Sequence, residues 1–78
     1  MRDLLEALAQ MLVDSPDEVS VEQFEEDDGT IVLELTVGED DYGKVIGRGG
    51  RTAKALRTVM TGVGGRGLRV DVVDTDGR

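Results

Sequence analysis

Several residue types that commonly carry chemistry are missing from this 78-residue sequence. It has no Cys, no His and no Trp. No disulfide can form, and the side chains that most often act as nucleophile or general base are absent. The Ser and Thr residues have no evident base partner, and the many carboxylates fall on predicted surfaces. We therefore expect no enzyme activity, no metal site and no cofactor.

Long apolar runs are also missing. None approaches the roughly 18 residues that a membrane span requires, and Asp3 and Glu6 interrupt the apolar core of any signal peptide. We expect a cytoplasmic protein without a membrane partner. The length predicts one domain, residues 1–78, with a frayed tail at residues 75–78. A domain of this size buries only about 60% of its unfolded surface, so it often depends on a partner or on dimerisation.

Charge is distributed unevenly along the chain, whose net charge is −8. Residues 1–42 carry 14 acidic and 1 basic side chains (−13), whereas residues 43–78 carry 8 basic and 3 acidic ones (+5). Between residues 43 and 70 every charged residue is basic: Lys44, Arg48, Arg51, Lys54, Arg57, Arg66 and Arg69. With a Debye length of about 8 Å, a polyanion on the basic face is largely screened from the acidic half. This pattern favours local anion binding, and the alternative is a solvated basic surface that only balances the acidic one.

The first residues predict an amphipathic helix. Its apolar residues recur at the spacing of one helix face: Leu4, Leu5, Leu8, Met11 and Leu12. We expect Asp3 to cap this helix, with Glu6 as its capping-box partner. Ser15-Pro16 ends the helix, because proline disfavours helix at the residue before it.

A β-hairpin is predicted next. Residues 19–25 read as a strand, and Asp28-Gly29 is a hairpin turn signal. Residues 31–37 alternate between two sets, with Ile31, Leu33, Leu35 and Val37 on one face and Val32, Glu34 and Thr36 on the other. This period of two predicts a strand with one buried face.

The second half predicts two helices and a last strand. Asp40 or Asp41 can cap a short helix that runs through Ile46 and is broken by residues 47–50. Residues 51–60 resume the helix, with an apolar stripe of Ala53, Leu56, Val59, Met60 and Val63. Residues 62–67 read as a flexible connection, followed by a strand in which Leu68, Val70 and Val72 alternate with polar residues. The order αββααβ predicts an α+β fold, a three-stranded sheet covered on one face by three helices.

The glycine-rich turn between the two helices carries the chemistry. Its glycines, Gly47, Gly49 and Gly50, permit positive φ and leave room for a close approach. The turn leads into a helix N-terminus, where free N–H groups and the helix dipole favour a phosphate. Arg48 and Arg51 add positive charge there. A corner that only packs the fold is the alternative, but the surrounding context favours a binding site.

The run Val45-Ile46-Gly47-Arg48-Gly49-Gly50 resembles the V-I-G-x-x-G core of KH domains. The element order resembles the bacterial, type II arrangement of that domain. The length, the opening amphipathic helix and residues 43–56 are similar to the small single-KH proteins of bacteria, the KhpA/YlqC family. One departure is the glycine-rich run at residues 62–65, where this family leads us to expect a longer helical end.

The resemblance implies an RNA-binding protein, acting as an RNA chaperone or a post-transcriptional regulator. In KH domains a GxxG loop clamps about four nucleotides of single-stranded RNA, and the bases lie in a groove beside a sheet edge. By resemblance the loop is Gly47, Arg48, Gly49 and Gly50, and an aliphatic groove is lined by Val45, Ile46 and Leu56. From charge we add Lys44, Arg51 and Lys54 as flanking phosphate contacts. The resemblance also implies a partner, as a homodimer or as a heterodimer with a second KH protein that carries a Jag-type domain.

Other interpretations fit less well. Residues 62–67 match G-x-G-x-x-G, but in dinucleotide folds that loop follows a strand and opens a helix, the reverse of the context here. Phe24 and Tyr42 are too few for an aromatic stacking platform. The strongest alternative is a KH-like interaction or scaffold module without RNA binding, which the acidic residues 1–42 support. Titration of a fluorescent single-stranded RNA separates the two.

Overall fold

The part of the chain that the structure describes forms three α-helices and three β-strands. A computed structural model describes residues 1–65 and 67–74, so the tail expected at residues 75–78 lies outside the described part. The elements are α1 (Arg2–Leu12), β1 (Ser20–Glu25), β2 (Ile31–Thr36), α2 (Tyr42–Ile46), α3 (Arg51–Gly64) and β3 (Leu68–Val72). Three short 3-10 turns are Pro16–Glu18, Glu39–Asp41 and Arg48–Gly50. The αββααβ order predicted from the sequence is confirmed.

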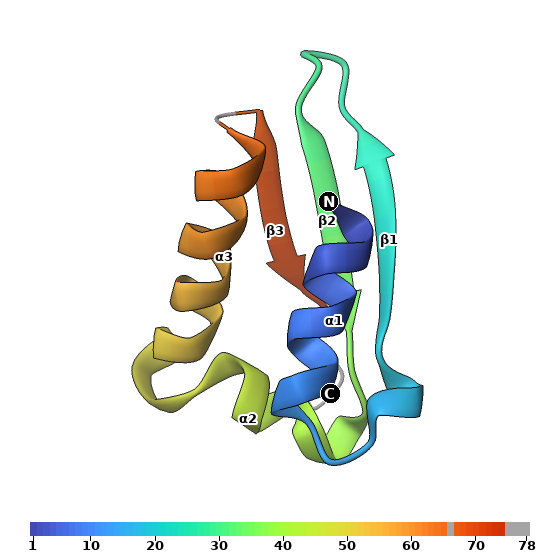
Figure 1. Cartoon of the computed structure of the whole chain (residues 1–78), viewed down its shortest axis with the longest axis vertical. Coiled ribbons are helices and arrows are strands. Elements are labelled where there is room, and N and C mark those ends of the chain that lie inside the picture. The colour runs from blue at the N-terminus through green and yellow to red at the C-terminus, as the bar shows by residue number, and fades with distance from the viewer. Residues whose placement is uncertain (66, 75–78) are drawn as a thin grey trace.

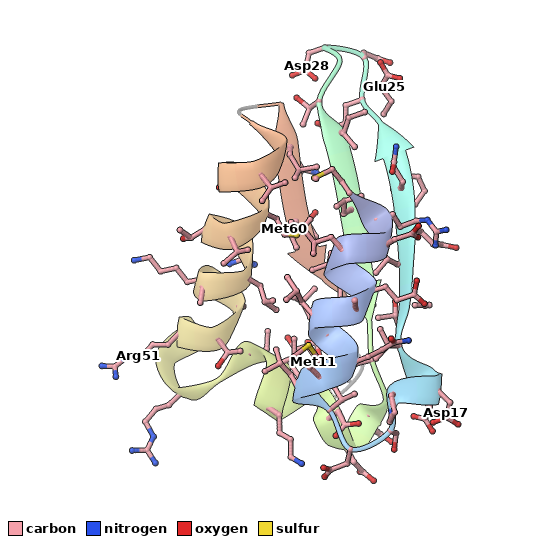
Figure 2. All side chains as sticks on the ribbon, in the orientation of Figure 1. Met11, Asp17, Glu25, Asp28, Arg51 and Met60 are labelled. Atoms are coloured by element: carbon pink, nitrogen blue, oxygen red, sulfur yellow. The ribbon has the colours of Figure 1, made fainter. Side chains whose placement is uncertain are left out.

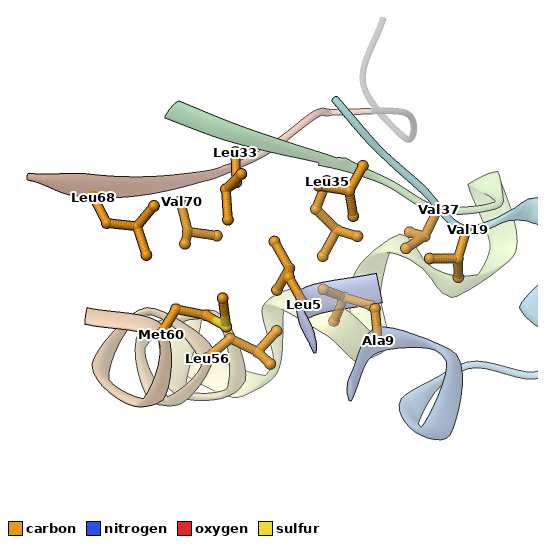
Figure 3. Packing of buried hydrophobic residues seen from close by; sticks show 12 residues of the cluster. Leu5, Ala9, Val19, Leu33, Leu35, Val37, Leu56, Met60, Leu68 and Val70 are labelled. Atoms are coloured by element: carbon orange, nitrogen blue, oxygen red, sulfur yellow. The ribbon is translucent and has the colours of Figure 1, made fainter. Parts of the chain in front are cut away.

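The strands form one mixed sheet in the order β1-β2-β3. β1 is antiparallel to β2, and β2 is parallel to β3. All three helices lie on the same face of this sheet (Figures 1 and 3), as the sequence predicts. The order leaves β1 and β3 as the two edge strands, and α3 packs beside β3.

The core lies between the sheet and the helix layer (Figure 3). Four elements contribute a pair of residues each: Leu5 and Ala9 from α1, Leu33 and Leu35 from β2, Leu56 and Met60 from α3, and Leu68 and Val70 from β3. β1 and α2 add Val21 and Val45. The prediction that β2 has only one buried face is wrong at Val32, which is buried on the face of the sheet opposite the helices. It belongs to the central strand and lies between Phe24 and Arg69 of the two neighbouring strands, whose side chains shield it.

Helix α1 differs from its prediction in its cap and in its buried face. The helix begins at Arg2 after Met1, with no side-chain cap, so Asp3 lies inside the first turn. Glu6 forms a 3.9 Å ion pair with Arg2 instead of a capping box. Only part of the predicted apolar stripe is buried, since the sheet covers a narrower arc of the helix than the stripe spans. Met11 is left 81% exposed.

Helix α3 is longer than predicted. It runs to Gly64, so residues 62–64 are helical and the expected connection there is wrong. Gly64 allows close packing against β3, because a Cβ at this position would lie 2.7 Å from a methyl carbon of Leu68. Val59 and Val63, predicted to be buried, are 49% and 58% exposed. They lie on a side of α3 that turns away from the sheet.

No helix in the described part of the chain is both long enough and apolar enough to cross a membrane.

Candidate nucleic-acid interface

The chain turns sharply between α2 and α3 at residues 47–50, hereafter the glycine loop. Gly47, Gly49 and Gly50 have φ of 78°, 65° and 78°, a region that disfavours other residues. Gly47 is required for space as well, since a Cβ there would collide with the Thr52 side chain and lie 2.9 Å from its backbone nitrogen. A Cβ at Gly49 would meet nothing within 4 Å. The positive φ values expected from the sequence are confirmed, and the outer part of the loop is open.

Two backbone N–H groups of the glycine loop make no hydrogen bond to any described residue. The N–H of Gly47 donates to Gly43 at 2.9 Å, and the N–H of Gly50 donates to Gly47 at 3.1 Å. Among the described residues, the N–H groups of Arg48 and Gly49 have no acceptor. They lie at the N-terminal end of α3, where the helix dipole also favours negative charge. The loop can therefore offer two amides to one anion.

Within the described residues, the cations without an ion-pair partner lie in the glycine loop and on the first half of α3. Three of the seven described basic residues are paired with carboxylates: Arg2 with Asp3 and Glu6, Lys44 with Asp14, and Arg69 with Glu26 and Asp71. The other four form no ion pair within residues 1–65 and 67–74: Arg48, Arg51, Lys54 and Arg57. All four lie in the glycine loop or on α3, and Figure 2 shows Arg51 extending away from the body of the protein. Uncompensated positive charge thus surrounds the free amides.

Helix α3 has two different flanks beside its buried face. Successive residues turn by about 100° around a helix, so Lys54 and Arg57 lie on one side and Ala55 and Val59 on the other. The Nε of Arg57 donates to the carbonyl of Val70 in β3 at 3.0 Å, which places that side against the sheet edge. We call the side with Lys54 and Arg57 the basic flank.

The opposite flank of α3 borders α1 across an apolar groove. The groove has a volume of about 250 Å³ and is lined by Leu8, Met11, Leu12, Thr52, Ala55, Leu56 and Val59. It contains part of both helix stripes that the sequence placed in the core, including the exposed Met11 and Val59. The apolar groove and the basic flank lie on opposite sides of the same helix.

The structure brings most of the predicted site residues together. Arg48, Gly49, Arg51 and Lys54 are exposed at the loop and in the first turn of α3, and Gly47 and Gly50 shape the turn. The three residues predicted to line an aliphatic groove behave differently. Val45 is fully buried in the core, which corrects that prediction, and Ile46 is half-buried. Leu56 lines the groove that faces α1, on the side away from the basic flank.

Lys44 is not a free cation. Its Nζ forms an ion pair with Asp14, which lies two residues after the end of α1. The hydrogen bond that Lys44 donates to Asp14 raises the pKa of Lys44 above its ordinary value. Sequence reasoning missed this pairing because 30 positions separate the two residues. It also left Arg57 out of the site, although the i, i+3 spacing from Lys54 is a signal that could have included it.

Asp41 has a structural role that the sequence did not reveal. It was expected as one of two possible helix caps, but its carboxylate makes no bond to α2. It accepts the backbone N–H groups of Asp14 and Ser15, each at 3.1 Å, and is 2% exposed. The bonds anchor the chain after α1 to the start of α2. Nowhere in the described part of the chain do three or more Asp or Glu side chains lie close enough together to hold a metal ion.

Comparison with known proteins finds matches to one protein family. The model of the KH domain of KhpA/KhpB matches residues 2–73. A protein of Mycobacterium tuberculosis named RNA-binding protein KhpA is 58% identical over 74 residues, covering 95% of this chain and 91% of that protein. Proteins of the same name from Streptomyces coelicolor and Halalkalibacterium halodurans are 54% and 49% identical, covering 97% and 95% of this chain and 95% and 100% of their own lengths. No solved structure gave a significant match.

Proposed function

The chain belongs to the KhpA/KhpB family of KH domains, and from this premise we propose that it binds single-stranded RNA at the glycine loop. One observation carries the proposal. The cations that lack an ion-pair partner within the described residues all lie in the glycine loop, which has two free amides, or on the first half of α3, which follows it. A phosphodiester supplies the negative charge and the acceptor oxygens that this arrangement lacks.

In the proposed complex the glycine loop contacts the RNA backbone. The N–H groups of Arg48 and Gly49 donate to phosphate oxygens, and the missing side chain at Gly49 leaves room for the backbone to approach. Arg48, Arg51 and Lys54 contact the flanking phosphates. Because Lys44 is already paired with Asp14, it contributes less than these three.

The proposed site predicts weak binding with a moderate dependence on salt. A KH loop clamps about four nucleotides, and this interface has no aromatic side chain on which a base could stack. If three or four phosphates are neutralised, log K falls against log[salt] with a slope of about −2 to −3. Fluorescence anisotropy with a labelled eight-nucleotide single strand, and with the same strand in a duplex, tests this. A slope near zero or a preference for the duplex contradicts the proposal.

The proposed cellular role is binding, not catalysis. The chain has no His and no Cys, and the interface offers donors and cations, not a nucleophile with its base. An RNA chaperone or post-transcriptional regulator acting in the cytoplasm fits a site that holds short single strands without cutting them. The names of the relatives state RNA binding and nothing further.

A protein partner is part of the proposal. The apolar groove leaves Met11 and Val59 open to solvent, and a small domain gains stability when such a surface is covered. We propose that a second copy of this chain, or a second KH protein with a Jag-type domain, covers it. Because the groove and the basic flank lie on opposite sides of α3, a partner there leaves the RNA site accessible.

The alternative function is a scaffold without RNA binding. The apolar groove and the acidic residues 1–42 are the observations that favour it. The two functions are separated by the titration above, because a scaffold that uses the groove shows self-association without any anisotropy change on addition of single-stranded RNA.

A further inference from the structure

Arg57 is held at the open edge of the sheet. Its Nε donates to the carbonyl of Val70 at 3.0 Å. Directly before and after β3, Gly67 accepts from Ile31 and Val73 donates to Leu35, so the backbone groups of the odd-numbered residues face β2. Alternate residues of a strand point their backbone groups to opposite sides. Val70 therefore faces away from β2, and Arg57 lies beside the free edge of β3.

Most N–H donors of the Arg57 guanidinium are not used within the described part of the chain. An arginine carries five N–H donors in one plane, and the bond to Val70 uses one of them. In the part of the chain that the structure describes, no carboxylate pairs with this side chain. The bond through Nε restrains the plane of the guanidinium, while its two terminal nitrogens remain available. Two parallel N–H donors of a guanidinium match a group that presents two adjacent acceptors.

Arg57 lies far enough from the glycine loop to contact a base of the bound strand and not only a phosphate. Arg57 lies six residues after Arg51, or about 9 Å further along α3. Four nucleotides span roughly 10 Å even when they are stacked at about 3.4 Å each. A strand whose phosphates contact the loop and Lys54 thus places a nucleotide beside Arg57. The neighbouring sheet edge limits the space in which its base can lie.

We propose that Arg57 is a specificity-determining residue that selects guanine or cytosine. Guanine presents O6 and N7 as adjacent acceptors, which arginine binds with two parallel hydrogen bonds, and cytosine presents O2 and N3 in the same way. Adenine and uracil offer no such pair on their Watson–Crick or Hoogsteen edges. The inference rests on the proposed function and names the bases that the RNA site prefers.

Base-substituted RNAs test this inference on the wild-type protein and on Arg57→Lys, which keeps the charge and removes the fork. The probes are labelled uracil octamers whose two central bases are uracil, adenine, cytosine, guanine or 7-deazaguanine, which lacks the N7 acceptor. We expect wild type to bind the guanine and cytosine octamers about tenfold more tightly than the others. With 7-deazaguanine most of that advantage is lost. Arg57→Lys binds all five within about twofold of one another.

Lys54→Gln is the matched control, on the same flank and one turn earlier. It should weaken binding to every octamer by a similar factor and reduce the salt slope by about 0.7, as expected for a lost phosphate contact. If Arg57→Lys keeps the wild-type preference for guanine and cytosine, Arg57 does not select the base and the inference is overturned. A lower melting temperature with unchanged base preference also overturns it, because Arg57 then only covers the edge of β3.

The wild-type titrations decide the matter if Arg57→Lys does not fold. Equal affinity for all five octamers contradicts this inference and leaves RNA binding intact. No binding to any octamer contradicts the proposed function itself, so the two failures are distinguishable.

Discussion

Asp41 accepts a hydrogen bond from the backbone N–H of Ser15 at 3.1 Å, although 26 positions separate them. The other carboxylate oxygen of Asp41 accepts a hydrogen bond from the backbone N–H of Asp14, also at 3.1 Å. These bonds fix the connection after α1 against the start of α2, the helix that leads into the glycine loop. The buried carboxylate therefore stabilises the corner of the fold on which the proposed RNA site is built.

Replacing Asp41 with Asn should destabilise the protein without changing the RNA-contacting residues. The amide oxygen can accept one of the two N–H groups, but the NH₂ group faces the other and leaves a buried donor unsatisfied. We expect a loss of about 1–3 kcal/mol in the free energy of unfolding, measured by urea denaturation. The neighbouring exposed carboxylate is the control, and Asp40→Asn should stay within about 0.5 kcal/mol of wild type. Equal losses for both variants contradict the proposed role of Asp41.

Asp14→Asn should strengthen RNA binding by releasing Lys44. The variant removes the carboxylate that pairs with Lys44 and keeps the backbone N–H that Asp41 accepts. One more available cation should make the slope of log K against log[salt] steeper by about 0.7. Asp17→Asn removes the same charge from an exposed position nearby and should leave the slope unchanged. If both variants change the slope equally, net charge and not the release of Lys44 is the cause.

RNA affinity should be constant within about twofold between pH 6 and pH 9. The chain has no His and no Cys, and the proposed contacts are Arg and Lys side chains. The hydrogen bond with Asp14 raises the pKa of Lys44, so its ion pair is complete below the ordinary lysine value of 10.5 and is lost only as the pH rises through the higher folded value. An anisotropy series that shows a step between pH 6 and pH 8 contradicts this assignment of contacts.

Val59→Asp should weaken self-association. It places a charge in the apolar groove, where a partner surface would have to desolvate it. Val63→Asp is the matched control, because Val63 is an exposed valine on the same helix that does not line the groove. Sedimentation velocity at several concentrations should show a shift toward monomer for Val59→Asp alone. A wild-type protein that stays monomeric at high concentration contradicts the homodimer, and capture of a KH partner by pull-down then tests the heterodimer.

The fold follows largely from local signals in the sequence. Alternation at Leu33 and Leu35, and again at Leu68 and Val70, locates β2 and β3. The helical spacing of Leu5, Leu56 and Met60 identifies the faces that cover them. Periodicity does not say how wide a face the sheet will cover, so Met11, Val59 and Val63 were placed in the core and lie outside it. The end of α3 was also missed, because glycine has low helix propensity and the contact of Gly64 with Leu68 is tertiary.

The site was predicted best where it is local. The glycine loop and its neighbouring cations are contiguous in sequence, so charge and glycine spacing located them. Long-range pairing was not accessible in this way. The bonds of Lys44 to Asp14, of Asp41 to Ser15 and of Arg57 to Val70 each join segments that only the folded chain brings together. These pairings decide which cations remain free and which side of α3 faces the sheet edge.

The double variant Arg48→Asp with Gly49→Asp tests the central claim most directly. Both positions are exposed, and a Cβ at Gly49 meets nothing within 4 Å, so the fold should persist. The positive φ at residue 49 costs an Asp about 1 kcal/mol, or roughly 4–8 °C in melting temperature for a domain of this size. Arg48→Gln with Gly49→Asn is the control, since it carries similar backbone strain without the added negative charge.

Circular dichroism melts and titrations with a single-stranded octamer are measured on the wild-type protein and on both double variants. The account predicts that the Asp variant stays folded and loses RNA binding, because two carboxylates then face the phosphate that the loop amides would hold. The Gln and Asn control should bind several-fold more weakly than wild type and still measurably. A folded Asp variant with unchanged RNA affinity would contradict the assignment of the glycine loop as the RNA site.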